Sequence, residues 1–309
     1  FESGFYAEAV RAFSRALEKN PAAETLRLKL RLSQGLEQFH AFNLDEALHF
    51  FEEYLGLLPR VEIRESHLAM IRKVCQKIQE EIPGKRKDGP HRELAKKATA
   101  LQKKLQESHP MDLVSTFLGA HVIPKDQRAD EYIRTVIKEM IPKIKDLARF
   151  CDVFCEKGVF TVAQSKKILD TGKQYGLIPK IHADEITPMG GTELAVELGA
   201  ISADHLLYAS DNGIRKMAQT GTVATLLPIT AFSLKESYAR ARFMIDDGCA
   251  VALATDFNPG SCFSESIPLL FSLATIYMGM TPEESVTALT INGAAAIGRE
   301  KSIGSLDEG

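Results

Sequence analysis

Several features that would point to other classes of protein are scarce or absent in this chain of 309 residues. No run of about 18 apolar residues is present and no signal peptide opens the chain, so we expect neither a membrane protein nor a secreted one. The net charge of −3 gives no basic field of the kind that nucleic-acid-binding proteins use. The five cysteines are odd in number and follow no disulfide or zinc-binding pattern, which is typical of proteins in a reducing cytoplasm.

The composition favours a soluble protein with a substantial core. Apolar residues make up 45% of the chain and charged residues 26%, which are ordinary values for a folded protein. The length is sufficient for two domains, and the pattern of apolar residues divides the chain into two unlike parts. We therefore predict a cytoplasmic protein in which an all-α segment precedes an α/β domain.

Residues 1–82 carry apolar residues at helical spacing throughout. One set of residues recurs 38 positions later, with Ala9, Phe13, Leu17 and Pro21 followed by Ala47, Phe51, Leu55 and Pro59. A helix that ends at a proline before the next helix begins is the pattern of a helical hairpin. The segment resembles tetratricopeptide repeats over about residues 1–80. It would either bind a protein or peptide partner in a groove or pack as a helical appendage, and the second is favoured because solenoids usually need about three repeats.

A boundary is predicted after these hairpins. Residues 83–90 combine proline, glycine and a basic triplet, as linkers do. One further helix, rich in lysine and leucine, is predicted over 91–107. The predicted organisation is therefore helical hairpins in 1–82, a linker and helix in 83–110, and an α/β domain in 111–309.

Beyond residue 111, short apolar runs alternate with amphipathic helices. The predicted strands are 113–119, 151–155, 178–182, 205–209, 222–227 and 251–256. The predicted helices are 129–147, 162–175, 191–198, 210–219, 233–246 and 264–278. This alternation implies a parallel sheet with right-handed crossovers. A closed TIM barrel has eight strands, so the pattern predicts an incomplete TIM-like (β/α) barrel.

Side chains that bind metals or move protons stand at the ends of three of these runs. His182 and Glu185 follow one run, His205 lies between two apolar stretches, and Asp256 ends the run 251–255. The carboxyl ends of the strands form the catalytic face of a (β/α) barrel. A neutral imidazole is a good ligand for zinc or iron, and a nearby carboxylate can transfer protons. The positions therefore predict a catalytic face.

Each of these residues also has a plain structural interpretation. A single histidine at a strand end is more often a hydrogen-bonded polar residue than a metal ligand, and Asp256 could be an ordinary strand cap. However, a carboxylate at the end of an almost wholly apolar strand has to be paired, hydrogen-bonded or metal-bound. The tight turn that follows, 256–260, can bring its backbone close to a ligand. Only the combination of the three strand ends favours a functional site.

Five motifs, in this order, resemble those of the imidazolonepropionases of the amidohydrolase superfamily. They are the segments 115–121, 182–185, 202–206, 255–261 and 288–297. The order of His, His and Asp along successive strand–helix units is also that of the superfamily. The resemblance runs over about 111–309 and is specific, because several long motifs agree in order and spacing.

The resemblance implies a hydrolase of histidine degradation, which opens the ring of imidazolone-5-propionate with water to give N-formimino-L-glutamate. It implies one zinc or iron ion, held by His182 and Asp256, that lowers the pKa of a bound water to roughly 7. The catalytic residues that it implies, which move protons and orient the water, are Glu185, His205 and Asp256. The residues that it implies for contacts with the small-molecule substrate are His121, Asn258, Gly260 and Ser261.

The chain departs from the family pattern in its metal ligands. The family carries His-x-His on the first strand of the barrel, and no two histidines of this chain are separated by one residue. The helical segment stands where that strand would lie, and the small β domain that usually flanks the barrel is also missing. Because a catalytic zinc normally has three protein ligands, His182 and Asp256 alone give an incomplete site. A neighbouring subunit of a homo-oligomer, or the helical segment, would have to complete it.

Three functions are compatible with the sequence. The first is an imidazolonepropionase-like hydrolase, which is inactive unless the ligands of the missing His-x-His motif are replaced. The second is a non-enzymatic helical-repeat interaction module fused to an inactive barrel fragment. The third is another amidohydrolase that acts on cyclic amides or deaminates its substrate, although the segments 117–121 and 256–260 argue against it. Metal content and turnover separate the first from the second, and substrate profiling separates the first from the third.

Overall fold

The computed structural model of the chain describes residues 112–124, 127–258 and 260–306. The predicted helical hairpins in 1–82 lie outside the described residues, as do the predicted linker and helix in 83–110. Their structure, and a partner for the hairpins, stay predictions.

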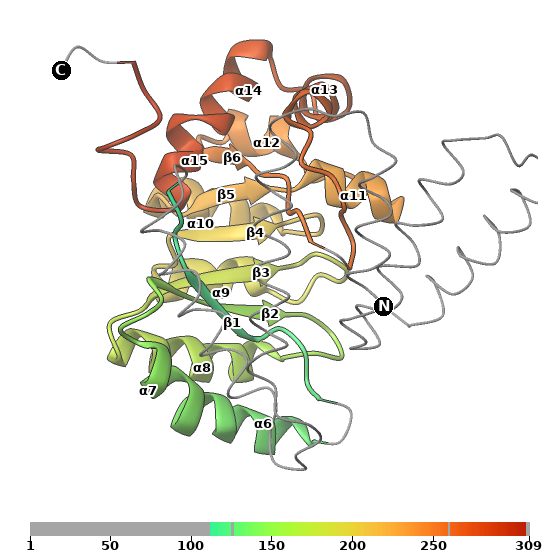
Figure 1. Cartoon of the computed structure of the whole chain (residues 1–309). Coiled ribbons are helices and arrows are strands. Elements are labelled where there is room, and N and C mark those ends of the chain that lie inside the picture. The colour runs from blue at the N-terminus through green and yellow to red at the C-terminus, as the bar shows by residue number, and fades with distance from the viewer. Residues whose placement is uncertain (1–111, 125–126, 259, 307–309) are drawn as a thin grey trace, which may run out of the picture. The chain divides into compact units, whose positions relative to one another are not determined.

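Six strands form one sheet, in which their order follows the order of the chain. The strands are β1 (Thr116–Ala120), β2 (Phe150–Cys155), β3 (Ile178–Ala183), β4 (Ser202–His205), β5 (Val223–Leu226) and β6 (Val251–Leu253). Every neighbouring pair is parallel, and Figure 1 shows the arrows of all strands pointing the same way. Parallel neighbours need crossover connections, which here contain helices. This architecture agrees with the predicted incomplete TIM-like barrel.

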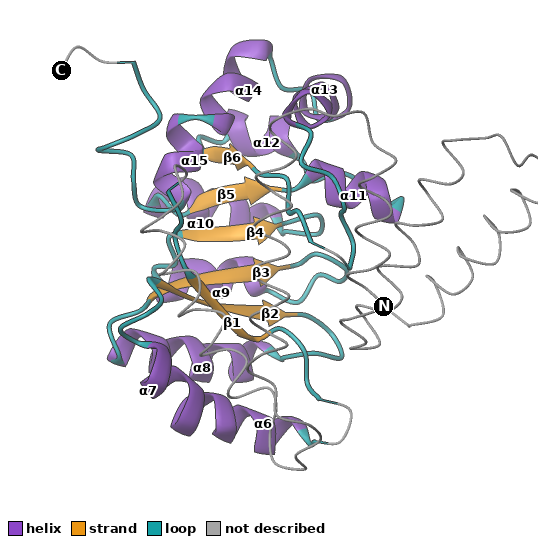
Figure 2. Ribbon diagram, in the orientation of Figure 1, coloured by secondary structure: helices purple, strands orange, loops and turns teal. Residues whose placement is uncertain are grey.

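Helices occupy the connections between the strands and the segment after β6 (Figure 2). They are α6 (Ala129–Thr135), the π-helical turn η1 (Val136–Met140), α7 (Ile141–Ile144), α8 (Val162–Gln174), α9 (Gly191–Leu198), α10 (Asp211–Thr220), α11 (Pro228–Leu234), α12 (Ala241–Asp246), α13 (Ile267–Tyr277), α14 (Pro282–Leu289) and α15 (Ile291–Ala296). The prediction of a helix over 191–198 coincides with α9, and the helix predicted over 129–147 corresponds to α6, η1 and α7 together.

Local signals in the sequence explain where several helices begin and end. Thr161 caps α8 through a capping box with Gln164, in which each side chain accepts a hydrogen bond from the backbone of the other. Gly199 and Gly221 follow α9 and α10 with φ angles of 62° and 76°. Glycine adopts this left-handed conformation without a steric penalty, so these residues end their helices.

The fourth strand lies earlier in the chain than the apolar pattern predicts. β4 comprises Ser202–His205, and the prediction of a strand over 205–209 was wrong. His205 has a φ of 76°, which ends the strand there. Asp204 interrupts the apolar pattern, but it is buried and accepts a hydrogen bond of 2.8 Å from Ser202. Lys180 Nζ lies 3.6 Å from the other oxygen of Asp204. A charged residue that is paired inside the fold cannot be distinguished from a loop residue by local hydrophobicity.

The helix predicted over 233–246 was also wrong, because the segment contains the end of one helix and the whole of another. Pro228 occupies the first turn of α11, where its missing N–H costs nothing. Lys235 then adopts a φ of 59° and ends the helix. α12 begins six residues later, at Ala241. The apolar start of α11 is buried on all sides, so it shows no helical alternation of polar and apolar residues.

The strands present two chemically different faces, since successive side chains alternate between them. One face of β2 and β3 is apolar and packs in the same core as α8 and α9; its buried residues include Cys151, Val153 and Ile181. The other face carries buried charged groups, among them Asp152 and Lys180, which are directly opposite each other in the β2–β3 register. Buried charges need partners, so a functional site is expected on this second face.

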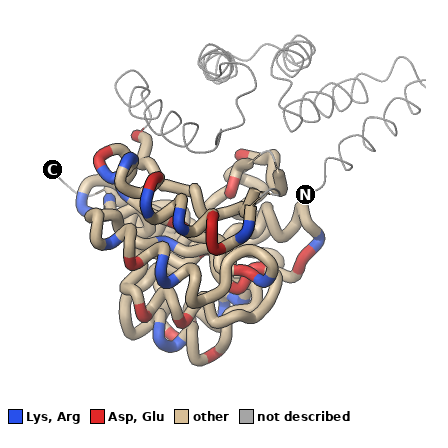
Figure 3. The backbone as a smooth tube through the Cα atoms, turned by 90° about the horizontal axis from the view of Figure 1, so that it is seen from below, with Lys and Arg blue, Asp and Glu red and all other residues tan. Residues whose placement is uncertain are grey.

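No helix among the described residues is long and apolar enough to cross a membrane. Figure 3 shows basic and acidic residues interspersed over the described part of the backbone. This mixture fits the small net charge of the sequence.

Candidate active site

The candidate site lies near the carboxyl ends of β1 to β4. His121 directly follows β1, Asp152 belongs to β2, His182 to β3, and His205 ends β4, while Glu185 lies in the loop after β3. Parallel neighbouring strands present their carboxyl ends at one edge of the sheet, which is where sites of this architecture form. Residues from four successive strands therefore meet although 84 positions separate His121 from His205.

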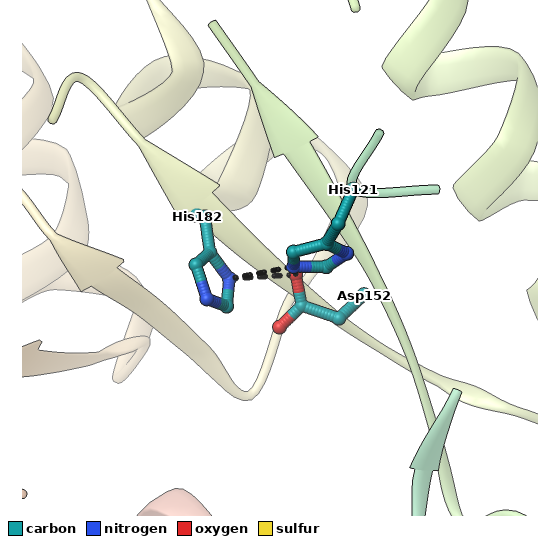
Figure 4. A group of neighbouring side chains, drawn as sticks. All are labelled: His121, Asp152 and His182. Carbon is teal, nitrogen blue, oxygen red and sulfur yellow. Dashed lines mark hydrogen bonds and ion pairs between the residues drawn. The ribbon is translucent and has the colours of Figure 1, made fainter. Parts of the chain in front are cut away.

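Three of these side chains converge on one point (Figure 4). His182 Nδ1 lies 2.9 Å from Asp152 Oδ1, and His121 Nε2 lies 3.4 Å from His182 Nδ1 and 3.5 Å from Asp152 Oδ1. The Asp152 side chain is 1% exposed, whereas those of His121 and His182 are 22% and 20% exposed. The carboxylate is thus buried beneath two imidazole rings that solvent can reach.

The pair of Asp152 and His182 carries opposite charges. Burial opposes the charge on His182, but the neighbouring carboxylates, Asp152 first and then Asp204 and Asp256, together outweigh it and raise the pKa of His182 to about 9. Burial also opposes ionisation of Asp152, yet the charge and the hydrogen bond of His182 hold the pKa of that carboxyl below its usual value. An imidazolium beside a carboxylate favours the ionised form of both groups, so the pair is charged at neutral pH.

The other two histidines are neutral at the same pH. Burial and the positive charge of His182 lower the pKa of His121 to about 4 and that of His205 well below its usual value. The rings of His182 and His205 are 5.1 Å apart between centroids. Neutral imidazoles can accept a proton or bind a metal ion. The site therefore combines one charged and two neutral histidines.

Glu185 titrates near neutral pH in this structure. Burial raises the pKa of its carboxyl to about 7, and its Oε1 lies 3.4 Å from His205 Nδ1. A general acid or base works best when its pKa lies near the working pH. Glu185 beside a neutral His205 is therefore suited to moving protons.

The loop after β3 is held by Asp184, which precedes Glu185 in the chain. Asp184 is buried and has a φ of 48°, a left-handed conformation that aspartate tolerates. Its two oxygens accept five hydrogen bonds, from the backbone N–H groups of Met189 (2.7 Å), Gly190 (3.0 Å), Gly191 (3.3 Å) and Thr192 (2.9 Å) and from Thr192 Oγ1 (2.5 Å). Several of these donors open α9, where a helix attracts negative charge. Asp184 thus ties the loop to the start of the helix.

Glu156 holds the same loop from the neighbouring strand end. It follows β2, it is buried, and it accepts hydrogen bonds from the backbone of Ile186 at 2.9 Å and from both the backbone and the hydroxyl of Thr187. Glu185 lies between Asp184 and Ile186, so both of its neighbours in the chain are fixed. The backbone on both sides of Glu185 is therefore held by two other carboxylates.

The loop after β6 is organised differently around Asp256. Its carboxylate accepts a hydrogen bond of 2.7 Å from Thr230 Oγ1, and burial raises its pKa. The side-chain amide of Asn258 donates to the backbone oxygen of Asp256, and its carbonyl accepts from the backbone N–H groups of Gly260 and Ser261, each at 2.8 Å. Asn258 thus closes the tight turn that the sequence predicts.

The structure brings part of the predicted site together. His121, His182, Glu185 and His205 form one cluster, whereas within the described residues no hydrogen bond or ion pair joins Asp256 to it. The charge of Asp256 nevertheless helps to raise the pKa of His182. Asn258, Gly260 and Ser261 form the turn beside Asp256, and their predicted role in substrate binding stays a prediction.

Asp152, which contacts both His121 and His182, was not predicted from the sequence. Asp152 lies inside an apolar run. A charged residue in an otherwise buried strand must have a partner, and this requirement is the sequence signal that could have identified it. The pattern alone could not name that partner, because His121 and His182 are 31 and 30 positions away.

The group formed by His121, Asp152 and His182 fits a metal ion. Each residue offers one ligand atom, and these atoms all lie within 4.8 Å of one another. Two imidazole nitrogens and a carboxylate oxygen are a donor set that zinc and iron accept. Asp256, which the sequence pairs with His182 as a ligand, is not part of this group.

Comparison with known protein families agrees with this geometry. The sequence signature of the amidohydrolase family matches residues 96–309, which make up more than two thirds of the chain. The chain belongs to the amidohydrolase family. The matched range includes all described residues and every residue predicted for the site.

Imidazolonepropionases are similar to the same part of the chain. The imidazolonepropionase of Bacteroides fragilis is 63% identical over 203 residues, which cover 64% of this chain and 49% of that protein. The imidazolonepropionase of Clostridium tetani is 56% identical over 232 residues, which cover 74% of this chain and 55% of that protein. The chain thus spans about half the length of the curated relatives that it matches.

Solved structures share the fold at low sequence identity. An adenosine deaminase from Xanthomonas campestris with bound zinc gives a TM-score of 0.51 at 16% identity, covering 68% of this chain and 53% of that chain. A putative prolidase from Bifidobacterium longum gives a TM-score of 0.55 at 16% identity, covering 70% of this chain and 63% of that chain. These likenesses support the partial barrel fold.

Proposed function

We propose that this chain is an imidazolonepropionase-like hydrolase that adds water to imidazolone-5-propionate and releases N-formimino-L-glutamate. One observation carries the proposal: three residues of the motifs that resemble this family, His182, Glu185 and His205, lie together at the strand ends. Identities of 56–63% to imidazolonepropionases over this region support the same substrate class.

The chain's own residues have separable roles in this proposal. Glu185, with a pKa of about 7, takes a proton from the attacking water and returns it to the ring nitrogen that leaves. His205 orients the water through its contact with Glu185. Asp256 is the third predicted catalytic residue, and its carboxylate, which accepts a hydrogen bond from Thr230, can also accept one from the water. The predicted substrate contacts are His121, Asn258, Gly260 and Ser261.

A zinc or iron ion is the cofactor that fits this chemistry. When bound, such an ion makes a water acidic enough to act as a nucleophile near neutral pH and polarises the carbonyl that is attacked. Two donor sets are possible, and His182 is a ligand in both. The resemblance adds Asp256 as the second ligand, whereas the geometry groups His182 with His121 and Asp152.

The test is turnover of imidazolone-5-propionate by the purified 309-residue chain, followed by appearance of N-formimino-L-glutamate. We expect turnover that is lost in Glu185→Gln, a variant that keeps the size of the side chain but cannot act as a base. A Glu265→Gln variant, in an exposed residue outside the site, serves as the matched control. Absence of product with a metal-loaded, folded chain would reject the proposal.

Other substrates and partners are tested in the same preparation. Deamination or hydrolysis of other cyclic amides, without turnover of imidazolone-5-propionate, would instead support a different amidohydrolase activity. Capture of a peptide by residues 1–82, with neither metal nor turnover, would support the non-enzymatic alternative. A homo-oligomer and a protein partner for the hairpins stay predictions, as does the cytoplasmic location.

A further inference from the structure

We propose that Asp152 is a positioning residue for His182. Its carboxylate accepts a hydrogen bond from Nδ1 of the His182 ring, and Nε2 is then the nitrogen that the ring offers to a metal ion. The inference deepens the proposed function and rests on it for the ion, which the resemblance assigns to His182. Asp152 acts only through the ring and is not itself a ligand.

The contact between the two side chains has the length of a charge-assisted hydrogen bond (Figure 4). His182 Nδ1 lies 2.9 Å from Asp152 Oδ1, whereas His121 Nε2 lies 3.4 Å from the same nitrogen. An ionised carboxylate can only accept a hydrogen bond, so the proton of this bond is on Nδ1. A ring nitrogen that carries a proton has no lone pair for an ion. Nε2 is therefore the nitrogen of His182 that can become a ligand.

The register of the strands places Asp152 on the inner side of His182. In the β2–β3 pairing, Asp152 is opposite Lys180 and Phe154 is opposite His182, so Asp152 lies two positions nearer the amino ends of the strands. The Asp152 side chain is 1% exposed and belongs to a strand that is paired on both sides, which fixes it. The ring is thus held from within the sheet. Its second nitrogen is left for the carboxyl ends of the strands, where sites of this architecture lie.

The same hydrogen bond explains why ligand-type atoms gather around Asp152. An ion shared by Asp152 Oδ1 and His182 Nδ1 would have to displace the proton that joins them, whereas an ion on Nε2 leaves that bond intact. When the ion binds, the proton of Nε2 goes to solvent and that of Nδ1 stays in place. A ligating histidine almost always donates its other N–H to a carboxylate, a carbonyl or a water, which fixes the tautomer and the orientation of the ring. Asp152 and His182 match this arrangement.

The first experiment measures the metal affinity of the full chain without reference to turnover. The protein is stripped with a chelator and titrated with Zn²⁺ against a competing chromophoric chelator. We expect Asp152→Asn to weaken binding about 10–100-fold, because its amide can donate an N–H to Nδ1 and so favour the tautomer that carries its proton on Nε2.

Asp204→Asn is the matched control for the loss of a buried carboxylate. Asp204 is opposite His182 in the β3–β4 register, and its carboxylate accepts a hydrogen bond from Ser202. The substitution removes a charge of the same kind and leaves the hydrogen bond to Nδ1 in place. We therefore expect Asp204→Asn to bind zinc within a few-fold of the unchanged chain.

A second measurement identifies the nitrogen that holds the ion. The chain is labelled with ¹⁵N-histidine and loaded with ¹¹³Cd²⁺, and the coupling between cadmium and nitrogen is detected by NMR. The signals of His182 are those that disappear in His182→Asn. We expect the coupling at Nε2 and a directly bonded proton on Nδ1. A purely structural role of Asp152 would not determine which nitrogen binds the ion.

Each outcome decides the inference. Coupling of cadmium to His182 Nδ1 would overturn it, as would an affinity loss in Asp152→Asn no larger than that in Asp204→Asn. A folded chain that binds no ion would also overturn it, because there would be no ligand to position. If Asp152→Asn does not fold, the coupling in the unchanged chain decides. An ion held at Nε2 without turnover of imidazolone-5-propionate would uphold the inference and reject the proposed function.

Discussion

The loops that follow β3 and β6 each contain an aspartate in the left-handed conformation, but the two carboxylates have different hydrogen-bond partners. Asp184 directly follows β3 and has a φ of 48°, and Asp256 is the third residue after β6 and has a φ of 51°. Five hydrogen bonds occupy the carboxylate of Asp184, whereas one side-chain hydroxyl, from Thr230, donates to that of Asp256. Hydrogen bonds within its own loop take up the carboxylate of Asp184, whereas the carboxylate of Asp256 accepts fewer hydrogen bonds and keeps more acceptor capacity.

The difference teaches that backbone conformation and residue type do not assign a role by themselves. A carboxylate that accepts several backbone N–H groups stabilises the fold, whereas one with spare acceptor capacity in a buried site can bind a ligand or move a proton. In the loop after β3 the proposed catalytic role belongs to the next residue, Glu185, whose backbone follows the anchored Asp184. The following variants test this difference between Asp184 and Asp256, from the largest expected effect to the smallest.

Asp256→Ala should reduce turnover of imidazolone-5-propionate by about 10³-fold, because general acid–base groups contribute about 10²–10⁴-fold to a rate. That loss corresponds to about 4 kcal/mol of activation free energy. The free energy of unfolding should change less than in Asp184→Ala, since the side chain of Asp256 accepts fewer hydrogen bonds than that of Asp184. Steady-state kinetics and urea unfolding on the same preparation measure both. Unchanged turnover would remove Asp256 from the catalytic residues.

Asp184→Ala should lower the free energy of unfolding by about 3 kcal/mol or more, because it leaves buried N–H groups without an acceptor. Urea unfolding against the unchanged chain gives the value. Asp256→Ala is the matched control, in which the same substitution is made at the same backbone conformation. Equal losses of stability in the two variants would show that the loops do not differ as described.

Gly191→Ala should destabilise the chain by about 1–3 kcal/mol, which is typical of overpacking. A Cβ at position 191 would lie 2.9 Å from Ala183 Cβ and 3.2 Å from Ala183 Cα, and neither atom can move easily because both belong to β3. Gly260→Ala is the control in the other loop, where the nearest atom is the side-chain oxygen of Asn258 at 3.2 Å. Thermal unfolding should show a clearly lower midpoint for Gly191→Ala than for Gly260→Ala.

Thr230→Val should cost about 1 kcal/mol, the value of a typical hydrogen bond. The substitution keeps the branched shape of the side chain and removes the hydroxyl that donates to Asp256. Urea unfolding measures the loss, and Thr255→Val, outside this hydrogen bond, is the comparison. A loss as large as that of Asp184→Ala would mean that Asp256 also has a mainly structural role.

Much of the fold could be predicted from the sequence because hydrophobic periodicity is a local property. The alternation of strands and helices after residue 111 predicted six strands, and the helix over 191–198 was predicted at its observed bounds. The errors fell where local patterns mislead. β4 contains the buried Asp204, and α11 begins with an apolar turn that is buried on all sides, so neither shows its usual pattern.

The sequence by itself placed His121, His182 and Glu185 at or just after the ends of predicted strands, and parallel pairing then requires them to share one edge of the sheet. The structure added His205 to that edge, because β4 ends at His205 instead of beginning there. Only the tertiary structure decided that Asp152 contacts His121 and His182. It also decided that hydrogen bonds within the loop take up the carboxylate of Asp184 and do not take up that of Asp256 in the same way. The physical reason is that the role of a carboxylate depends on the donors around it. Those donors come from other elements, such as His182 for Asp152, 30 positions away, and Thr230 for Asp256, 26 positions away.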